Sequence, residues 1–141
     1  MKGDLTVNQK PLTVMAKPQT VTYGTDIARE LGQEIIEIDG LAGSETITAV
    51  TLTPSTTDAT NGTEGTITPS AVKVTKADGT TDSTGNYAIT CQTGSLTINR
   101  KPVTVTVNAD ATKTYGDNDP AFTYDVVGLV GEDTLAGALS R

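Results

Sequence analysis

The chain has 141 residues, a formal net charge of −7, one cysteine, no histidine and no tryptophan. An acidic chain is a poor partner for nucleic acid or an anionic membrane, because both attract basic surfaces. The lack of histidine removes the commonest metal ligand and the commonest general base near neutral pH. The lone Cys91 cannot form an internal disulfide, and no apolar run is long enough to cross a membrane.

Apolar and polar residues, the latter mostly threonine, alternate along most of the chain, which predicts strands with one buried face. Asn61-Gly62 and Asp78-Gly79 are typical of tight hairpin turns between such strands. We therefore predict an all-β fold of sandwich-like or β-grasp-like units in tandem, with mainly antiparallel strands. In chain order, the residues predicted to share apolar strand faces are Leu5 and Val7; Leu12, Val14 and Ala16; Ile47 and Ala49; Val72 and Val74; Tyr87, Ile89 and Cys91; Leu96 and Ile98; and Val103, Val105 and Val107.

One segment is ambiguous between helix and strand. Ile27, Leu31 and Ile35 have helical spacing, and Asp26 is a suitable N-cap. We interpret residues 34–39 as a strand, because their counterpart later in the chain has a plain strand pattern, and we allow one short helical turn near residues 26–31.

The chain repeats itself, with three echoes in the same order. An ordered set of echoes at a spacing close to the size of a small domain indicates tandem copies of one unit. The echoes pair residues 3–14 with 94–105, residues 22–24 with 114–116, and residues 40–47 with 128–135.

These echoes predict the domain boundaries. Residues 1–9 are expected to be the end strand of a preceding unit, residues 10–100 a complete unit, and residues 101–141 the first part of a following, incomplete unit. The apolar face changes from even to odd positions across Asn99–Pro102, so one extended stretch leaves one core and enters the next. Pro102 interrupts the hydrogen-bond ladder there, and the short linker predicts closely spaced units.

Tyr23-Gly24 and Tyr115-Gly116 are the sharpest local motifs. We interpret each tyrosine as packing its ring on the edge of a core, rather than as a ligand contact. Cys91 is expected to be a buried, inert thiol on the face of Tyr87 and Ile89, and no histidine could activate it.

Two acidic turns, Asp117–Asp119 and Glu132–Asp133, are rich in oxygen ligands. Their spacing does not match an EF-hand loop, and Asx-rich turns form readily without metal, so calcium binding is left open. Carboxylate pairs for sugar cleavage also stay open, although a sugar cleft would lack tryptophan platforms. We predict no catalytic, cofactor-binding or metal-ligating residue and no cofactor.

Four segments together resemble the MBG-type repeat (Tyr-Gly type) of large bacterial surface proteins and adhesins: the Lys101–Val105 strand, the Thr114–Pro120 turn, Gly128–Leu135 and Leu139–Arg141. Gly85–Ile89 and Gly94–Ile98 resemble the end of such a repeat. Unit 10–100 departs from the family pattern, since Thr25-Asp26 replaces the Asp-rich turn and Pro120 has no counterpart. The resemblance implies an extracellular, non-enzymatic repeat and carries over no catalytic residue.

The predicted function is a structural or adhesive repeat, a stalk or spacer, of a bacterial cell-surface protein. The alternatives are a module that binds a glycan or a host protein, and an accessory domain of a secreted enzyme. Expected partners are neighbouring repeats of the same chain and, for the first alternative, a host glycan or protein; no nucleic acid and no membrane insertion are expected. Residues 101–141 lack the strands matching residues 72–98, so their open sheet edges are also expected to allow a dimer.

Overall fold

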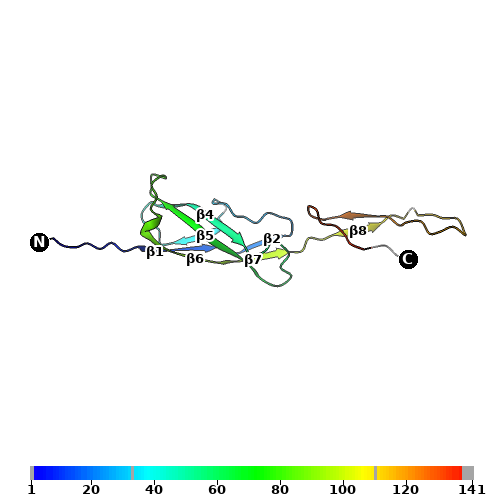
Figure 1. Cartoon of the computed structure of the whole chain (residues 1–141), viewed down its shortest axis with the longest axis horizontal. Coiled ribbons are helices and arrows are strands. Elements are labelled where there is room, and N and C mark those ends of the chain that lie inside the picture. Colours follow the sequence, from blue (N-terminus) through cyan, green and yellow to red (C-terminus); the bar gives the residue numbers. More distant parts are fainter. Residues whose placement is uncertain (1, 33, 110, 138–141) are drawn as a thin grey trace. The chain divides into compact units, whose positions relative to one another are not determined.

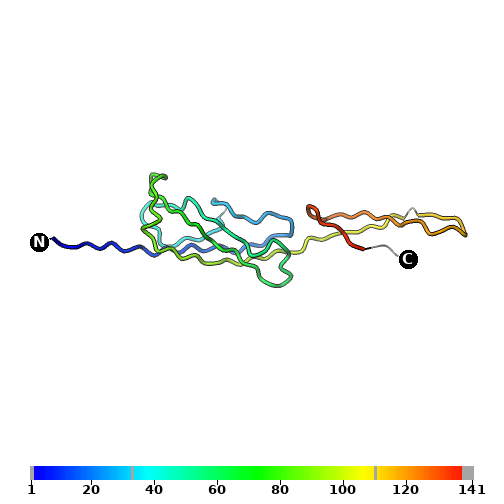
Figure 2. The backbone as a smooth tube through the Cα atoms, in the orientation of Figure 1, coloured from blue at the N-terminus to red at the C-terminus, as the bar shows by residue number. Residues whose placement is uncertain are grey.

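The computed structural model describes residues 2–32, 34–109 and 111–137. The chain divides into two compact units, unit 1 (Met1–Asn99) and unit 2 (Arg100–Arg141). The described residues form strands, turns and one 3₁₀ turn but no α-helix, which confirms the all-β prediction (Figures 1 and 2). The elements are β1 (Lys10–Ala16), β2 (Gln19–Thr22), β3 (Ile36–Asp39), β4 (Thr46–Pro54), β5 (Gly65–Thr75), η1 (Thr84–Asn86), β6 (Tyr87–Gln92), β7 (Gly94–Asn99), β8 (Thr104–Val107) and β9 (Tyr124–Val127).

Unit 1 consists of two sheets, with strand orders β3-β1-β6 and β2-β7-β5-β4. Two long stretches of chain each contribute one strand to each sheet. The first stretch, residues 10–22, forms β1 in one sheet and β2 in the other. The second stretch, residues 87–99, likewise forms β6 and then β7. These stretches run side by side, because β1 pairs with β6 and β2 pairs with β7, both in parallel. All other pairs are antiparallel, so the sheets are mixed with a majority of antiparallel pairs.

The two long stretches pass side by side from one sheet to the other. The first does so between Ala16 and Gln19, and the second does so at Gly94. A Cβ atom on Gly94 would lie 2.3 Å from the carbonyl oxygen of Ala16 and 2.9 Å from that of Lys17. Those atoms belong to backbone and cannot swing away as a side-chain tip would. Glycine is therefore required where the second stretch passes the first one at the crossing.

The core of unit 1 contains many of the alternating residues that the sequence indicates, and Ile27, Ile35, Leu52 and Ile67 in addition. Leu12, Val14 and Ala16 are almost completely buried, and β5 and β7 supply the opposing side chains. The threonines that lie between these residues along each strand are exposed or half-buried. Alternation with a period of two thus places one face of each strand in the core. The buried apolar residues are Leu12, Val14, Ala16, Ile27, Ile35, Leu52, Ile67, Val72, Val74, Tyr87, Leu96 and Ile98.

Residues 23–32, between β2 and β3, form turns and irregular structure, so the helical turn allowed near residues 26–31 is wrong. Gln19 explains how the backbone there is satisfied without a helix. Its side-chain amide donates to the carbonyl of Ala28 at 2.9 Å, and its oxygen accepts from the N–H of Ala28 at 3.0 Å. Ile27 and Ile35 still reach the core from this irregular segment, which accounts for their apolar spacing. Residues 36–39 of the predicted strand 34–39 form β3.

The first nine residues behave differently from the matching strand β7. Residues 3–9 form no strand, and Leu5 and Val7 are 88% and 84% exposed. Their counterparts Leu96 and Ile98 are buried. That residues 1–9 end a preceding unit stays a prediction.

Unit 2 contains the antiparallel pair β8–β9, which reproduces the pair β1–β3 of unit 1. Val14 faces Ile38 in unit 1, and at the corresponding place Val105 faces Val126. The bond that closes the pair is also repeated. The N–H of Lys17 donates to the carbonyl of Ile35 at 2.8 Å. At the corresponding place in unit 2, the N–H of Asn108 donates to the carbonyl of Thr123 at 2.9 Å. The sequence repeat is therefore a repeat of backbone register and hydrogen bonding.

Candidate functional site

The two Tyr-Gly motifs form the same turn in both units. The N–H of Thr25 donates to the carbonyl of Thr22 at 2.9 Å, and the N–H of Asp117 donates to that of Thr114 at 3.1 Å. The glycine that follows each tyrosine has a positive φ, 82° in unit 1 and 96° in unit 2. This conformation suits glycine, which explains the Tyr-Gly pairing.

The tyrosine rings of these turns have different surroundings. Tyr23 packs against the core of unit 1, as predicted. Tyr115 is fully exposed in unit 2, so the predicted packing of its ring on the edge of a core is wrong for this copy. The difference follows from the strands present, because unit 1 has β4–β7 around its turn and the described part of unit 2 has no counterpart of them.

The Gly-Leu motif also has a steric reason. A Cβ on Gly40 would lie 2.3 Å from the carbonyl oxygen of Pro11, and a Cβ on Gly128 would lie 2.3 Å from that of Pro102. Each glycine thus lies where the chain passes directly over the start of the first strand of its unit. The motif serves the packing of backbone against backbone and presents no chemical group.

Tyr87 joins β6 to the turn after β3, a contact that the sequence alone did not reveal. Its ring is buried, its hydroxyl oxygen accepts from the N–H of Ala42 at 3.0 Å, and its hydroxyl donates to the carboxylate of Glu45. The hydrogen bond to Glu45, together with burial, raises the pKa of Tyr87 above its ordinary value of 10.0. The phenol is therefore neutral at physiological pH and acts as a tie between two elements.

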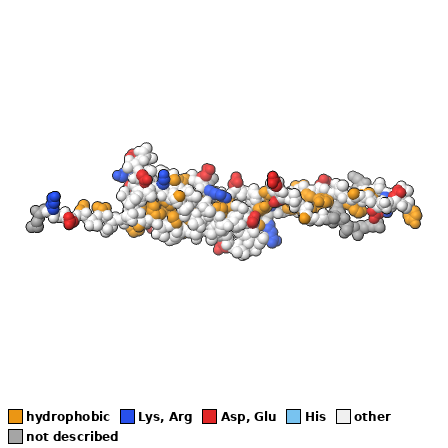
Figure 3. All heavy atoms as spheres, in the orientation of Figure 1, with side chains coloured by type: hydrophobic (Ala, Val, Ile, Leu, Met, Phe, Trp, Pro, Cys, Tyr) orange, Lys and Arg blue, Asp and Glu red, His pale blue; other side chains and the backbone are white. Residues whose placement is uncertain are grey.

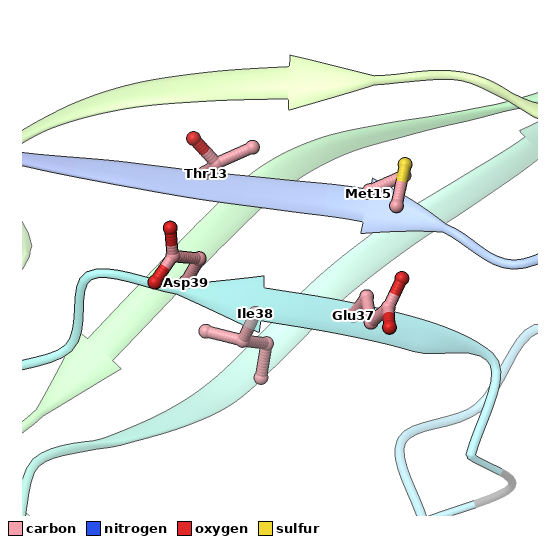
Figure 4. A pocket seen from close by; sticks show the side chains of 5 residues that line it. All are labelled: Thr13, Met15, Glu37, Ile38 and Asp39. Atoms are coloured by element: carbon pink, nitrogen blue, oxygen red, sulfur yellow. The ribbon is translucent and has the colours of Figure 1, made fainter.

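A shallow hollow of about 180 Å³ lies on β1 and β3 and is lined by Thr13, Met15, Glu37, Ile38 and Asp39. Thr13 and Met15 project from β1, and the two carboxylates project from the neighbouring strand β3 (Figure 4). Glu37 and Asp39 are exposed. Ligand pockets generally enclose more volume and exclude water from their polar groups, so this hollow lacks the features of a catalytic or ligand-binding site.

The acidic turn of unit 2 is engaged by a lysine. Lys113 forms an ion pair with Asp119 and donates to the carbonyl of Asp117 at 3.3 Å. Asp133, in the second acidic turn, uses its backbone N–H to close a turn on Val130 at 2.9 Å. Within residues 2–32, 34–109 and 111–137, no three His, Cys, Asp or Glu side chains gather around a possible metal position.

Cys91 is exposed, so the prediction of a buried thiol is wrong. The predicted strand face is right, because Cys91 pairs in register with the buried Val14. However, β6 is an edge strand, and the burial of this face decreases from its first residue to its last. Tyr87 is buried, Ile89 is half-buried and Cys91 is exposed to solvent.

We expect a thiol reagent to label Cys91 in the folded protein at a rate close to that in denaturant, because the side chain is accessible. Cys91→Ser should change the free energy of unfolding by less than about 0.5 kcal/mol, as is usual for exposed positions. Ellman's reagent at neutral pH, with and without denaturant, measures the ratio of the two rates. Labelling only after denaturation would place Cys91 in the core.

Asp78 organises the exposed loop between β5 and η1. Its carboxylate accepts from the N–H groups of Thr80 at 2.9 Å and Thr81 at 2.8 Å, and from the hydroxyl of Thr81. These bonds, led by the one from the Thr81 side chain, lower the pKa of Asp78 from 3.8 to about 2. Bonds from Thr84 lower the pKa of Asp82 in the same loop.

The Asp78 contribution to stability is expected to depend on pH. Because its pKa is lower in the folded state, the contribution is fully present above the unfolded pKa of 3.8 and is lost as the pH falls to about 2. Urea unfolding of the wild type and Asp78→Asn should therefore show a stability difference that shrinks between pH 4 and pH 2. A difference that stays constant over this range would contradict the assignment.

Residues 103–141 match the family model of the MBG domain (YGX type). The match covers β8, the Tyr115-Gly116 turn and β9, so the turn is the motif after which the family type is named. The MBG domain is a non-catalytic repeat module that typically occurs in bacterial surface proteins. Neither a curated protein nor a solved structure matches the chain.

The MBG match gives residues 10–46 of unit 1 a structural parallel. The register of β1–β3 and the Tyr-Gly turn recur within the matched residues, and the Gly40 contact recurs between Gly128 and Pro102, the residue just before the match. Among the described residues, no helix is long and apolar enough to span a membrane.

Proposed function

We propose that the chain is part of a non-catalytic spacer or adhesive repeat array on the outer surface of a bacterial cell. The observation that carries this proposal is the position of the two ends of unit 1. The first long stretch enters at Lys10, which pairs with Tyr87, and the second long stretch leaves at Asn99, which pairs with Thr22. Since the two stretches are parallel, entry and exit lie at opposite ends of the unit, roughly 40 Å apart for about 13 extended residues.

This placement suits a spacer. A unit that receives the chain at one end and releases it at the other adds its full length to the array. A short connection follows β7, since only Arg100–Val103 separate it from β8. Pro102 within this connection restricts its backbone, and short linkers that contain proline are stiffer than Gly/Ser linkers.

The repeat itself also supports the proposal. Tandem copies of a small β unit build length or multiply a weak surface, and the shared register of β1–β3 and β8–β9 is evidence of such copies. The net charge of −7 suits a surface protein that must stay soluble.

The alternative of a glycan-binding module has less support in unit 1. An exposed cluster of tyrosines on one sheet face would favour it. However, the two tyrosines of unit 1 are used in packing, Tyr23 against the core and Tyr87 inside it. Neighbouring repeats of the same chain are therefore the partners that we propose first.

The experiment is small-angle X-ray scattering on the chain extended to two complete units. The proposal predicts an elongated particle with a maximum dimension close to twice that of one unit. As a control, Gly/Ser residues replacing Asn99–Pro102 should broaden the distance distribution. A compact particle with the dimension of a single globule would overturn the spacer function and favour a ligand cleft between units.

A further inference from the structure

We propose that the two parallel ladders of unit 1, β1–β6 and β2–β7, act as a mechanical clamp that resists stretching of the chain. This inference rests on the proposed spacer function, because only an array fixed at both ends is pulled. It adds a property that a spacer does not need, namely a high resistance to force along its length.

The direction of the load follows from the chain path. Tension enters unit 1 at Lys10 and pulls β1 towards its N-terminal end. Tension leaves at Asn99 and pulls β7 towards its C-terminal end. β1 and β7 belong to different sheets, but the two long stretches that contain them run parallel through the pairs β1–β6 and β2–β7. The load therefore forces these two stretches to slide past each other in opposite directions.

Sliding loads the ladders in shear. Six register pairs join β1 to β6 and four join β2 to β7. Hydrogen bonds between strands lie across the strand direction, so a pull along the strands loads the bonds of a ladder together. A pull that opens a ladder from one end would instead break its bonds one after another.

Further contacts hold the end of β7 where the load is applied. The carbonyl of Asn99 accepts from the N–H of Tyr23 at 2.8 Å, which continues the ladder beyond β2. On the other edge of β7, the carbonyl of Ile98 accepts from the N–H of Thr60 at 3.0 Å. The N–H of Ile98 donates to the hydroxyl oxygen of Thr60 at 3.2 Å. The last residues of β7 are therefore bonded on both sides.

Side-chain packing opposes the same movement. Leu12 and Val14 project from β1, and Leu96 and Ile98 project from β7, and all four are at most 2% exposed. A slide of even one residue would take these side chains out of the cavities that they fill, and would bring the other strand face towards the core. The ladders and the core must therefore yield together.

Single-molecule force spectroscopy on the full chain tests the clamp by changing only the pulling points. All variants carry Cys91→Ser, which removes an exposed thiol. Asn8→Cys with Lys101→Cys attaches the handles at the two ends of unit 1 and loads the ladders in shear. Asp26→Cys with Lys101→Cys attaches both handles at one end of the β2–β7 ladder and peels it open. Asn8, Asp26 and Lys101 are exposed, so the substitutions should leave the melting temperature unchanged.

At equal pulling speed, we expect a rupture force roughly twofold or more higher in the shear geometry, because forced unfolding is governed by the barrier along the pulled direction. Equal forces in the two geometries, with unchanged melting temperatures, would overturn the clamp. That result would leave the spacer function intact, because scattering tests the length of the array and not its strength.

Discussion

Gly94→Ala is expected to destabilise unit 1 by about 3 kcal/mol or more, enough to unfold a marginally stable domain. The added methyl carbon would lie 2.3 Å from the carbonyl oxygen of Ala16 and 2.8 Å from its carbonyl carbon. Both atoms belong to the backbone of the first long stretch, and Gly94 belongs to the second, so relief requires the two stretches to separate where they change sheet. The substitution should therefore weaken both parallel ladders.

Gly85→Ala is the matched control, since a Cβ on Gly85 has no atom within 4 Å. It should change the free energy of unfolding by less than about 1 kcal/mol. Urea unfolding followed by circular dichroism measures both variants. If Gly94→Ala were as stable as Gly85→Ala, the close approach of the two stretches would be wrong.

The second large effect is expected from a pair of identical substitutions in the two copies of the repeat. Val14→Ala should cost about 2 to 3 kcal/mol, because it removes two buried methyl groups and leaves a cavity. Val105→Ala, at the corresponding register position, should cost less than about 0.5 kcal/mol. The difference comes from exposure: Val14 is 0% exposed and Val105 is 43% exposed.

The two substitutions change the same residue type at the same register position of equivalent strands, β1 and β8. The two sites differ in how far other side chains bury the valine. Figure 3 shows apolar side chains on the surface of the unit 2 hairpin, where Val103, Val105 and Val107 are all exposed. Unfolding of each variant by urea, with hydrogen exchange to separate the two units, gives the two costs. Equal costs would mean that the two copies are covered to the same extent.

The alternation of apolar residues predicted most of the strands and much of the core, but residues 3–9 have the same alternation and form no strand. Leu12, Val14 and Ala16 were placed correctly because a face covered along its whole length obeys the two-residue period. Cys91 has the parity of the buried Tyr87 on β6 but is exposed, so its burial was predicted wrongly. Parity identifies the face of a strand, whereas burial depends on which other strands reach across it, and nothing in residues 87–92 indicates where the cover over β6 ends.

The parallel pairing of β1 with β6 and of β2 with β7 could not be predicted from the sequence pattern either. Hairpin turns such as Asn61-Gly62 indicate antiparallel neighbours, because such turns join strands that are adjacent in the chain. β1 and β6 are far apart in sequence, and no local signal connects them. Similarly, the irregular path of residues 26–31 depends on the Gln19 side chain, a partner that helical spacing does not reveal.

The repeat identified two motifs in the sequence, although the structure was needed to assign the steric roles of their glycines. The Tyr-Gly turn and the glycine of the Gly-Leu motif have steric roles that recur in both copies. The tie from Tyr87 to Glu45 was missed, because it joins residues whose proximity depends on the whole fold. A recurring acidic residue, Asp133, at the place of Glu45 was the only trace of it in the sequence.

We propose that β8 and β9 open a second copy of the unit 1 fold, and that strands equivalent to β4–β7 would bury the apolar face of β8. Hydrogen exchange on a longer chain, in which a second copy of residues 47–99 follows Thr134, tests it most directly. An added segment of the same composition in scrambled order serves as the control. The claim predicts that the amides of β8 become about as protected as those of β1, with Val103, Val105 and Val107 buried. Amides of β8 that exchange as fast with the added strands as with the scrambled segment would contradict it.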